Sequence, residues 1–406
     1  MKITQVRSVK LDGELDRNEP IWEERIAMPL DVYPEFREQG PQKVMPTWMG
    51  VDSTQGKIPI SCIFAEVEVE DGTIGFAGPI DEVQAFLIDR MIKPLVVGED
   101  PRASERIWDK MYRGIESHGR KGAPMQALSA VDCAIWDLKG KLAGEPVYRL
   151  LGGPLRDRIP AYASALGFGL NETSINLRIN QIVKAGYKAT KWFFRYGPGS
   201  GPEGIEKNVE MVRMLREATG DDIDIMLDCW RSWDVRYTLE MGEKIAGYNP
   251  RWLEEPIFAD QIESHAFLRN ALPFPISTGE HEYTRWGFKA LMDAGAADVL
   301  QPDVLWAGGV TELVKICALG STYEIQIIPH AHTVATVQVL AAQSASLCPM
   351  LEFLMNHSVI HQFFFRQPIE PSNGVVVLPE GPGMGVDIDE SKVQSRKILD
   401  WGGAQL

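Results

Sequence analysis

The chain has 406 residues, which is too long for a single hydrophobic core of ordinary size. Its residues are 45% hydrophobic and 24% charged, which is typical of a soluble globular protein. The net charge of −15 argues against nucleic acid and anionic membranes as partners, since both favour basic patches. No apolar run reaches the roughly 18 residues of a membrane span, and the five scattered cysteines lack Cys-x-x-Cys spacing. We therefore expect a soluble, cytoplasmic protein with free thiols.

The first third of the chain predicts an α+β domain. Residues 1–10 alternate like a strand, and residues 59–70 and 74–77 flank a turn, which predicts a hairpin. Helical patterns follow over 82–93, 103–114 and 123–143. We place this domain at residues 1–125.

Residues 20–57 interrupt this pattern with several Pro and Gly residues and with aromatic side chains. A loop of this length within a compact protein is usually functional or disordered. We expect either a lid over a pocket or a packed wrapping segment.

The rest of the chain predicts a barrel. Helical spacing over 126–152 breaks at Gly144 and Pro146, and strands then alternate with helices. The expected strands are 158–163, 187–194, 223–228, 250–254, 275–280, 297–302, 325–330 and 350–354. Eight such units predict a (β/α)8 barrel over residues 126–372, and residues 373–406 return to strand and turn character, packing back on the first domain.

Six charged or imidazole side chains end successive apolar runs at intervals of 22 to 27 residues, which is about one βα unit each. They are Asp228, Glu254, Glu280, Asp303, His330 and Glu352. Because the carboxyl ends of barrel strands converge on one mouth, all six should meet there.

Two groups stand out among the six. Asp228, Glu254 and Glu280 form an all-oxygen set on consecutive strands, which suits Mg²⁺, although barrel-mouth acids can also be solvated or salt-bridged. Asp303 and His330 end neighbouring strands, so the carboxylate can orient the imidazole as a general base.

This arrangement, together with the motif over 130–141 (AVDCAIWDLKGK), resembles the enolase superfamily, mandelate racemase subgroup. The resemblance implies a capping domain on the barrel, completed by the C-terminal segment. It also implies one Mg²⁺ held by Asp228, Glu254 and Glu280, and the His330–Asp303 pair as the base. Glu352 would contact the carboxylate side of the substrate, and the reaction would remove a proton α to that carboxylate through an enediolate.

The second barrel strand favours dehydration over racemisation. Racemases of the subgroup end this strand with Lys-x-Lys; here Lys191 matches the first lysine and Phe193 replaces the second. A single base suffices for dehydration, since His330 can remove the C2 proton and then protonate the departing 3-hydroxyl group. A racemase, epimerase or cycloisomerase stays the alternative. The resemblance also implies that Lys191 is a catalytic residue, and a salt bridge with Glu254 or Glu255 is the other interpretation of this lysine.

The motifs at 191–201, 227–235, 278–281 and 301–311 are similar to the L-rhamnonate dehydratase group. That similarity implies a small sugar-acid substrate, an aldonate converted to a 2-keto-3-deoxy acid, and a homo-oligomer. The chain departs from this group at two places. Arg25 stands where histidine is expected, and the segment after the base is Pro329-His-Ala-His-Thr-Val334, with His332, where Pro-His-Gly-Ser-Ser-Val is expected. We expect Arg25, His281 and His332 to contact the substrate, with a surface position open for Arg25 and outward positions open for the two histidines. A non-catalytic sugar-acid sensor is the alternative of another class.

Overall fold

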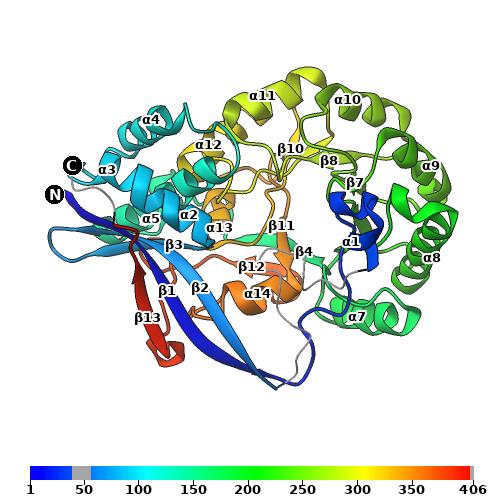
Figure 1. Cartoon of the computed structure of the whole chain (residues 1–406), viewed down its shortest axis with the longest axis horizontal. Helices are drawn as coiled ribbons and strands as arrows, with labels where there is room; N and C mark the ends of the chain where they lie inside the picture. The colour runs from blue at the N-terminus through cyan, green and yellow to red at the C-terminus, as the bar shows by residue number, and fades with distance from the viewer. Residues whose placement is uncertain (39–55, 403–406) are drawn as a thin grey trace.

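The computed structural model describes residues 1–38 and 56–402, which form two separate sheets (Figure 1). The smaller, antiparallel sheet has the order β13-β1-β2-β3, and the larger one curves through nine strands. Figure 1 places the small sheet with α2–α5 on the left and the barrel helices in an arc on the right. The two-part architecture predicted above is therefore confirmed.

The small sheet joins the two ends of the chain. Its strands are β1 Ile3–Arg17, β2 Gly56–Val69, β3 Ile74–Ile80 and β13 Ser395–Leu399. The predicted hairpin is β2–β3, and β1 runs beyond the predicted residue 10 because it pairs with β2 as far as Arg17 and Gly56. The C-terminal strand β13 lies on the other side of β1, with Ser8 opposite Leu399.

Helices follow the hairpin in the chain, and several of them contact the strands of this sheet. They are α2 Glu82–Leu87, α3 Lys93–Val96, α4 Ser104–Ile115, α5 Ala123–Ala143 and α6 Val147–Leu150, with a π-helical turn at Ile88–Ile92 between α2 and α3. The long helix α5 approaches β3 so closely that a Cβ at Gly75 would lie 2.2 Å from the Ala134 carbonyl oxygen. Its Asp137 accepts a hydrogen bond of 2.9 Å from the Phe76 amide, which ties the helix to the strand.

The barrel strands are the eight predicted, although most are shorter. They are β4 Arg158–Ser164, β5 Ala189–Phe193, β6 Asp224–Asp228, β7 Trp252–Glu254, β8 Ile276–Thr278, β9 Val299–Leu300, β10 Gln326–Ile327 and β11 Leu351–Leu354. The eighth strand returns beside the first, since Leu351 pairs with Ala161 in parallel. A further strand, β12 Val375–Val377, pairs antiparallel with the start of β4.

Eight helices follow the barrel strands, and most of them lie in an arc around the strands (Figure 1). They are α7 Glu172–Lys184, α8 Gly201–Thr219, α9 Val235–Ile245, α10 Ile262–Ala271, α11 Thr284–Ala294, α12 Gly309–Thr322, α13 Val334–Ala341 and α14 Met355–His361. Several have local start signals: Asn171 caps α7 by accepting from the Ser174 amide, and Asp234 caps α9 by accepting from the Tyr237 amide.

Side chains fill the barrel interior in layers. One buried cluster consists of Tyr162, Ala189, Met226, Trp252, Val299 and Ile328, each from a different strand or its end. Strand alternation turns the residue two positions later to the same side. That next layer is polar: Ser164, Lys191, Asp228, Glu254, Gln301 and His330. The buried apolar cluster therefore fills the barrel interior below the polar layer, which begins two residues further along each strand.

Part of the irregular segment packs on the barrel. The Glu23 amide donates to the Gly167 carbonyl at 2.7 Å, and the Ala27 amide to the Phe194 carbonyl at 2.7 Å. Two short helical turns follow, η1 Pro29–Val32 and α1 Pro34–Glu38. The remainder of the predicted lid or wrapping segment, residues 39–55, lies outside the described residues.

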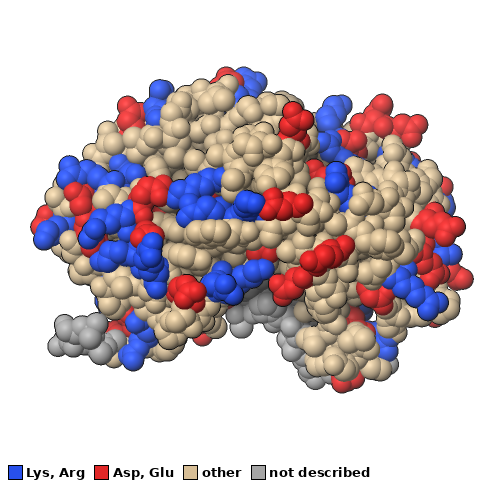
Figure 2. All heavy atoms as spheres, turned by 90° about the horizontal axis from the view of Figure 1, so that it is seen from above, with Lys and Arg blue, Asp and Glu red and all other residues tan. Residues whose placement is uncertain are grey.

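All five cysteines are buried free thiols, as predicted. Among the residues described, no helix is long and apolar enough to cross a membrane. On the face in Figure 2, acidic side chains interrupt the lysines and arginines, so this face offers no unbroken basic surface.

Candidate active site

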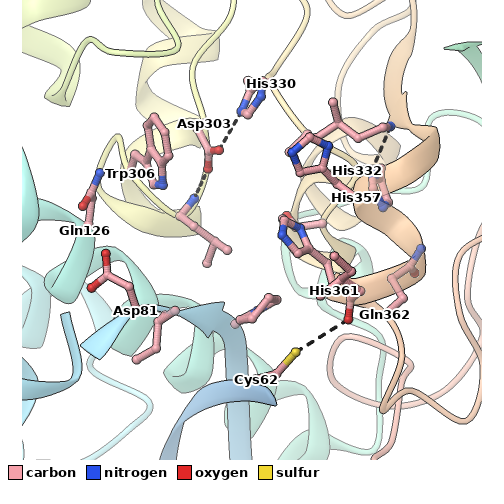
Figure 3. Close-up of a pocket in the computed structure, with 18 of the residues that line it drawn as sticks. Cys62, Asp81, Gln126, Asp303, Trp306, His330, His332, His357, His361 and Gln362 are labelled. Carbon is pink, nitrogen blue, oxygen red and sulfur yellow. Dashed lines mark hydrogen bonds and ion pairs between the residues drawn. The ribbon is translucent and has the colours of Figure 1, made fainter. Parts of the chain in front are cut away.

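A cavity of about 650 Å³ lies where the barrel mouth faces the small sheet (Figure 3). The barrel loops contribute Asp228, Glu280, Asp303 and His330, among others, to its lining. The small sheet and its helices contribute Ile58–Cys62, Gly78–Asp81, Gln84 and Gln126. Four of the six predicted strand-end residues therefore reach one cavity, and the other two, Glu254 and Glu352, lie buried beneath it.

Lys191 occupies the centre of the buried polar layer. Its Nζ lies 2.5 Å from Glu254 Oε1, 2.8 Å from Glu352 Oε1 and 3.3 Å from Asp228 Oδ2, and its side chain has no exposed surface. Glu254 uses its second oxygen to accept from Trp252 Nε1 at 3.0 Å and from Gln301 Nε2 at 2.9 Å. The salt bridge between Lys191 and Glu254 is observed, and the expected catalytic role of Lys191 stays a prediction.

The predicted metal ligands form a buried carboxylate cluster. Burial raises the pKa of Asp228 to about 6 and that of Glu254 to about 7, although Lys191 opposes both shifts. Burial also raises the pKa of Glu280. A bound cation would stabilise the ionised form of these buried carboxylates. An all-oxygen donor set suits Mg²⁺. These residues therefore fit the expected metal.

A second donor set shares Glu280. One oxygen or nitrogen from each of Glu255, Glu280 and His281 lies within 4.8 Å of the others, which is close enough to hold an ion. Glu255 Oε2 lies 2.7 Å from His281 Nδ1, and Glu255 Oε1 accepts from the His281 amide at 3.2 Å. Although burial acts in the opposite direction, His281 and Arg231 lower the pKa of Glu255 to about 2, so this carboxylate is firmly ionised.

The predicted base pair is assembled. His330 Nδ1 lies 2.8 Å from Asp303 Oδ2, and the other oxygen of Asp303 accepts from the Leu305 amide at 2.7 Å (Figure 3). His330 Nε2 lies 3.7 Å from Glu280 Oε1 and 3.9 Å from Glu352 Oε2. Burial works against it, but Glu280, Glu352 and Asp303 together raise the pKa of His330 to about 10. A cation shared with Glu280 would lessen this effect.

Glu352 is held from two sides. Its Oε2 accepts from the Ala331 amide at 3.0 Å, and its Oε1 faces Lys191. Lys191 and His330 overcome the effect of burial and lower the pKa of Glu352 to about 2. Ala331 has a φ of 63°, a left-handed conformation that a non-glycine residue adopts only under constraint, so the chain turns sharply at this contact.

Three histidines line the cavity wall that faces Asp303 and Trp306 (Figure 3). They are His332, His357 and His361, the last two from α14. Burial lowers the pKa of His332 to about 3 and that of His361 to about 4, so both are neutral. His332 Nδ1 accepts from the Leu354 amide at 3.2 Å, which leaves Nε2 as the protonated nitrogen.

The three residues expected to contact substrate have different positions. His281 and His332 line the cavity. Arg25 is not among the described lining residues; its Nη1 and Nη2 form a buried fork with Asp31 at 2.7 and 2.9 Å. Arg25 is therefore neither a surface arginine nor free to donate these hydrogen bonds to a ligand.

Several lining residues were not predicted. Trp230 and Arg231 follow β6, Trp306 follows β9, and Gln126 comes from α5. Trp306 lies with its ring centroid 5.2 Å from that of His281 and 6.0 Å from that of His330, so it bridges the two imidazoles. The spacing of His357 and His361, one helical turn apart just after Glu352, was a signal that could have been used.

Two protein-family models match the chain. Residues 36–152 match the model of the mandelate racemase / muconate lactonizing enzyme N-terminal domain, and residues 176–392 match the enolase C-terminal domain-like model. An L-rhamnonate dehydratase of Saccharopolyspora erythraea is 35% identical over 98% of this chain and 100% of its own length.

Solved structures agree. Rhamnonate dehydratase from Gibberella zeae, complexed with Mg, superposes with a TM-score of 0.82 at 31% identity, over 97% of this chain and 96% of that one. The 3,6-anhydro-D-galactonate cycloisomerase from Zobellia galactanivorans gives a TM-score of 0.77 at 27% identity, over 97% and 100% of the two chains. The chain belongs to the mandelate racemase / muconate lactonizing enzyme family of the enolase superfamily.

Proposed function

We propose that this Mg²⁺-dependent acid-sugar dehydratase removes water from an aldonate of the L-rhamnonate type and yields a 2-keto-3-deoxy acid. The relatives that carry this activity match almost the whole chain. The single observation that supports the proposal best is the His330–Asp303 pair of 2.8 Å, whose Nε2 faces Glu280 and Glu352 at the cavity.

His330 performs both proton steps in this proposal. In the neutral imidazole, which a bound cation would favour, Nδ1–H donates to Asp303 and Nε2 carries the lone pair. Nε2 takes the C2 proton, and the substrate becomes an enediolate. The protonated Nε2 then donates to the 3-hydroxyl group, the C3–O bond breaks, and water leaves. The resulting enol gains a proton at C3 and loses the proton of its 2-hydroxyl group, which gives the 2-keto acid.

Asp228, Glu254 and Glu280 would hold the metal. A bound Mg²⁺ supplies positive charge next to the substrate carboxylate, where removal of the C2 proton places additional negative charge. Lys191 contributes a permanent positive charge directly beneath this region, through its contacts with Asp228, Glu254 and Glu352.

The opposite face of the site supports a one-base reaction. Phe193, which stands where a racemase of the subgroup has its second lysine, is fully buried and pairs in register with Asp228. Phenylalanine transfers no proton, and the ammonium group of Lys191 is committed to three carboxylates.

An epimerase or cycloisomerase is the second candidate, because the mouth contains another imidazole–carboxylate pair. His281 Nδ1 lies 2.7 Å from Glu255 Oε2, and its Nε2 lies 3.9 Å from Glu280 Oε1, much as His330 Nε2 does at 3.7 Å. A second base at this position would permit proton transfer on two sides of a substrate carbon.

The test is to incubate the purified protein and Mg²⁺ with a stereochemically complete set of aldonates and aldarates and to measure 2-keto acid formation. We expect a product with at least one sugar acid, and a fall in kcat of about 10²–10⁴-fold in His330→Asn. The same reactions in D2O identify the alternative, since an epimerase introduces deuterium at C2 without loss of water. Absence of 2-keto acid from the whole set would contradict the dehydratase proposal.

Two expectations from the sequence also stay proposals: a cytoplasmic location and a homo-oligomeric state. The five buried free thiols support the first, because a reducing compartment maintains free thiols. Light scattering of the purified protein tests the second.

A further inference from the structure

Arg231 is the one fixed positive charge among the described residues that line the cavity. It stands three positions after Asp228, on the loop that leaves β6. The same lining includes the carboxylates of Asp81, Asp228, Glu280 and Asp303. An arginine in these surroundings would ordinarily be neutralised by a close carboxylate, so its actual contacts decide what it does.

The backbone holds Arg231 at the mouth in a constrained conformation. Trp230 has a φ of 44° and Arg231 a φ of 62°, two consecutive left-handed residues of which neither is glycine. The Trp230 amide donates to Asp228 Oδ1 at 2.9 Å, and the Arg231 amide donates to the Glu255 carbonyl at 2.6 Å. Such conformations persist where the surroundings enforce them, and they concentrate at functional sites.

The guanidinium group itself is poorly satisfied. Its Nε is buried and donates no hydrogen bond; the closest carboxylate oxygen, Glu255 Oε2, is 3.7 Å away, beyond hydrogen-bond distance. That oxygen already has His281 Nδ1 at 2.7 Å. Within the described part of the chain, no terminal nitrogen of Arg231 donates a hydrogen bond either, and the group rests 4.9 Å from the Trp230 ring centroid.

Arg231 is therefore a positioned but unused donor. The side chain is 22% exposed and belongs to the cavity lining, so its remaining N–H groups are available to a ligand in the cavity. A guanidinium presents its N–H groups as a planar fork, which matches the two oxygens of a carboxylate. The contact with the Trp230 ring, 4.9 Å from the guanidinium carbon to the ring centroid, helps to hold the group in place.

We propose that the preferred substrate carries a second carboxylate at the end of its carbon chain, and that Arg231 binds it. The substrate class is then a sugar diacid, an aldarate. This inference rests on the proposed dehydratase function: it keeps the reaction and the reacting end of the substrate, and it replaces the aldonate of that proposal by a diacid. The position agrees with it, because β6 lies four strands from β10 in the sheet order, which places Arg231 across the mouth from His330.

The first experiment compares turnover of an aldarate and of the aldonate with the same stereochemistry. The wild-type protein should prefer the diacid, and Arg231→Gln should lower kcat/KM for the diacid about 10–100-fold more than for the monoacid, mainly through KM. Arg231→Lys should restore part of the difference. Arg236→Gln, the same charge change at an exposed position of α9 outside the cavity lining, is the matched control.

Equal losses for both substrates in Arg231→Gln would overturn the inference, because Arg231 would then act on the carboxylate that both share. A stronger preference for an aldonate with a terminal phosphate would also overturn it, since the anion recognised would be a phosphate.

A binding measurement separates this inference from the proposed function. Titration calorimetry with Mg²⁺ and a 3-deoxy aldarate, which has no leaving group, is compared with the 3-deoxy aldonate. Tighter binding of the diacid that Arg231→Gln abolishes supports the inference even where no sugar acid is turned over. Turnover of aldonates without any diacid preference in binding would contradict the inference and leave the proposed function standing.

Discussion

At the scale of single residues, Lys191 explains how three carboxylates can be buried next to one another. Glu254 and Glu352 raise the pKa of Lys191 above its ordinary value, against the effect of burial, so the ammonium stays charged. Breaking a buried ion pair by removing one partner leaves an uncompensated charge and is strongly destabilising. Lys191 should therefore matter for folding as well as for the charge of the site.

We predict that Lys191→Met lowers the free energy of unfolding by about 3–5 kcal/mol at neutral pH without added metal, because Glu254 and Glu352 lose their cation. Urea denaturation measures this. Lys207→Met is the control: it removes an exposed ammonium on α8 and should cost less than about 0.5 kcal/mol. If the two variants unfold at the same urea concentration, the buried ammonium contributes nothing to stability.

Residues at or just after strand ends were predictable from the sequence, whereas the positions of Arg25 and Arg231 on irregular backbone were not. Asp228, Glu254 and His330 stand two positions after the inward-facing Met226, Trp252 and Ile328, so alternation alone determines their direction. Arg25 lies on an irregular segment, and its guanidinium turns to Asp31 rather than to the cavity. Arg231 depends on two left-handed residues, a conformation for which a non-glycine sequence gives no signal.

At the scale of elements, one buried carboxylate fastens α5 to α12. Asp132 Oδ2 accepts from the Thr311 amide at 2.9 Å, and Oδ1 accepts from the Thr311 hydroxyl at 2.7 Å. The helices are so close that a Cβ at Gly309 would lie 2.3 Å from Asp132 Oδ2. Burial raises the pKa of Asp132 to about 7, from an ordinary value of 3.8.

This shift predicts a pH dependence of stability. The unfolded chain releases the Asp132 proton near pH 4, whereas the folded chain keeps it until about pH 7, so folding binds a proton in between. The contribution of Asp132 is therefore complete below pH 4 and declines as pH rises to 7, by up to about 1.4 kcal/mol per pH unit.

Asp132→Asn removes the titrating group and keeps a polar side chain of the same size. We expect its free energy of unfolding, relative to wild type, to increase between pH 4 and 7 and then to level off. Urea denaturation at a series of pH values measures the difference. Parallel curves for the two proteins would show that Asp132 ionises normally in the folded chain.

The order of helices and strands was more predictable from the sequence than the residues at which each one begins and ends. The apolar run ending at residue 302 predicts six residues of strand, but only Val299 and Leu300 pair, since the chain then turns to place Asp303 at the mouth. Likewise, β12 was expected to pack on the capping domain with the rest of the C-terminal segment, yet it pairs with β4 of the barrel. Pairing between distant segments leaves no periodic trace in either one.

At the scale of the whole molecule, the cavity exists only because two sheets from distant parts of the chain face each other. Its lining combines β2 and β3 of the small sheet with loops after β6, β8, β9 and β10. The carboxylates expected to hold Mg²⁺ come from three different strands, so an ion bound there links elements that separate on unfolding. Metal binding and the stability of the fold are then coupled.

We predict that Mg²⁺ at 100 times its dissociation constant stabilises the protein by about 2.7 kcal/mol relative to the protein in EDTA. Thermal unfolding with and without metal measures this shift. The ion has two candidate donor sets. One is the set expected from the strand ends, Asp228, Glu254 and Glu280; the other is Glu255, Glu280 and His281, whose donor atoms lie within 4.8 Å of one another. The two sets share only Glu280. Asp228→Asn should abolish the shift if the first set holds Mg²⁺, whereas His281→Asn should then reduce it little. The reverse pattern would move the metal to the second set and contradict the ligands predicted from the strand ends.

Asp260→Asn removes an exposed carboxylate and controls for loss of charge. Glu280→Gln should abolish the shift in either case, because both donor sets require that carboxylate.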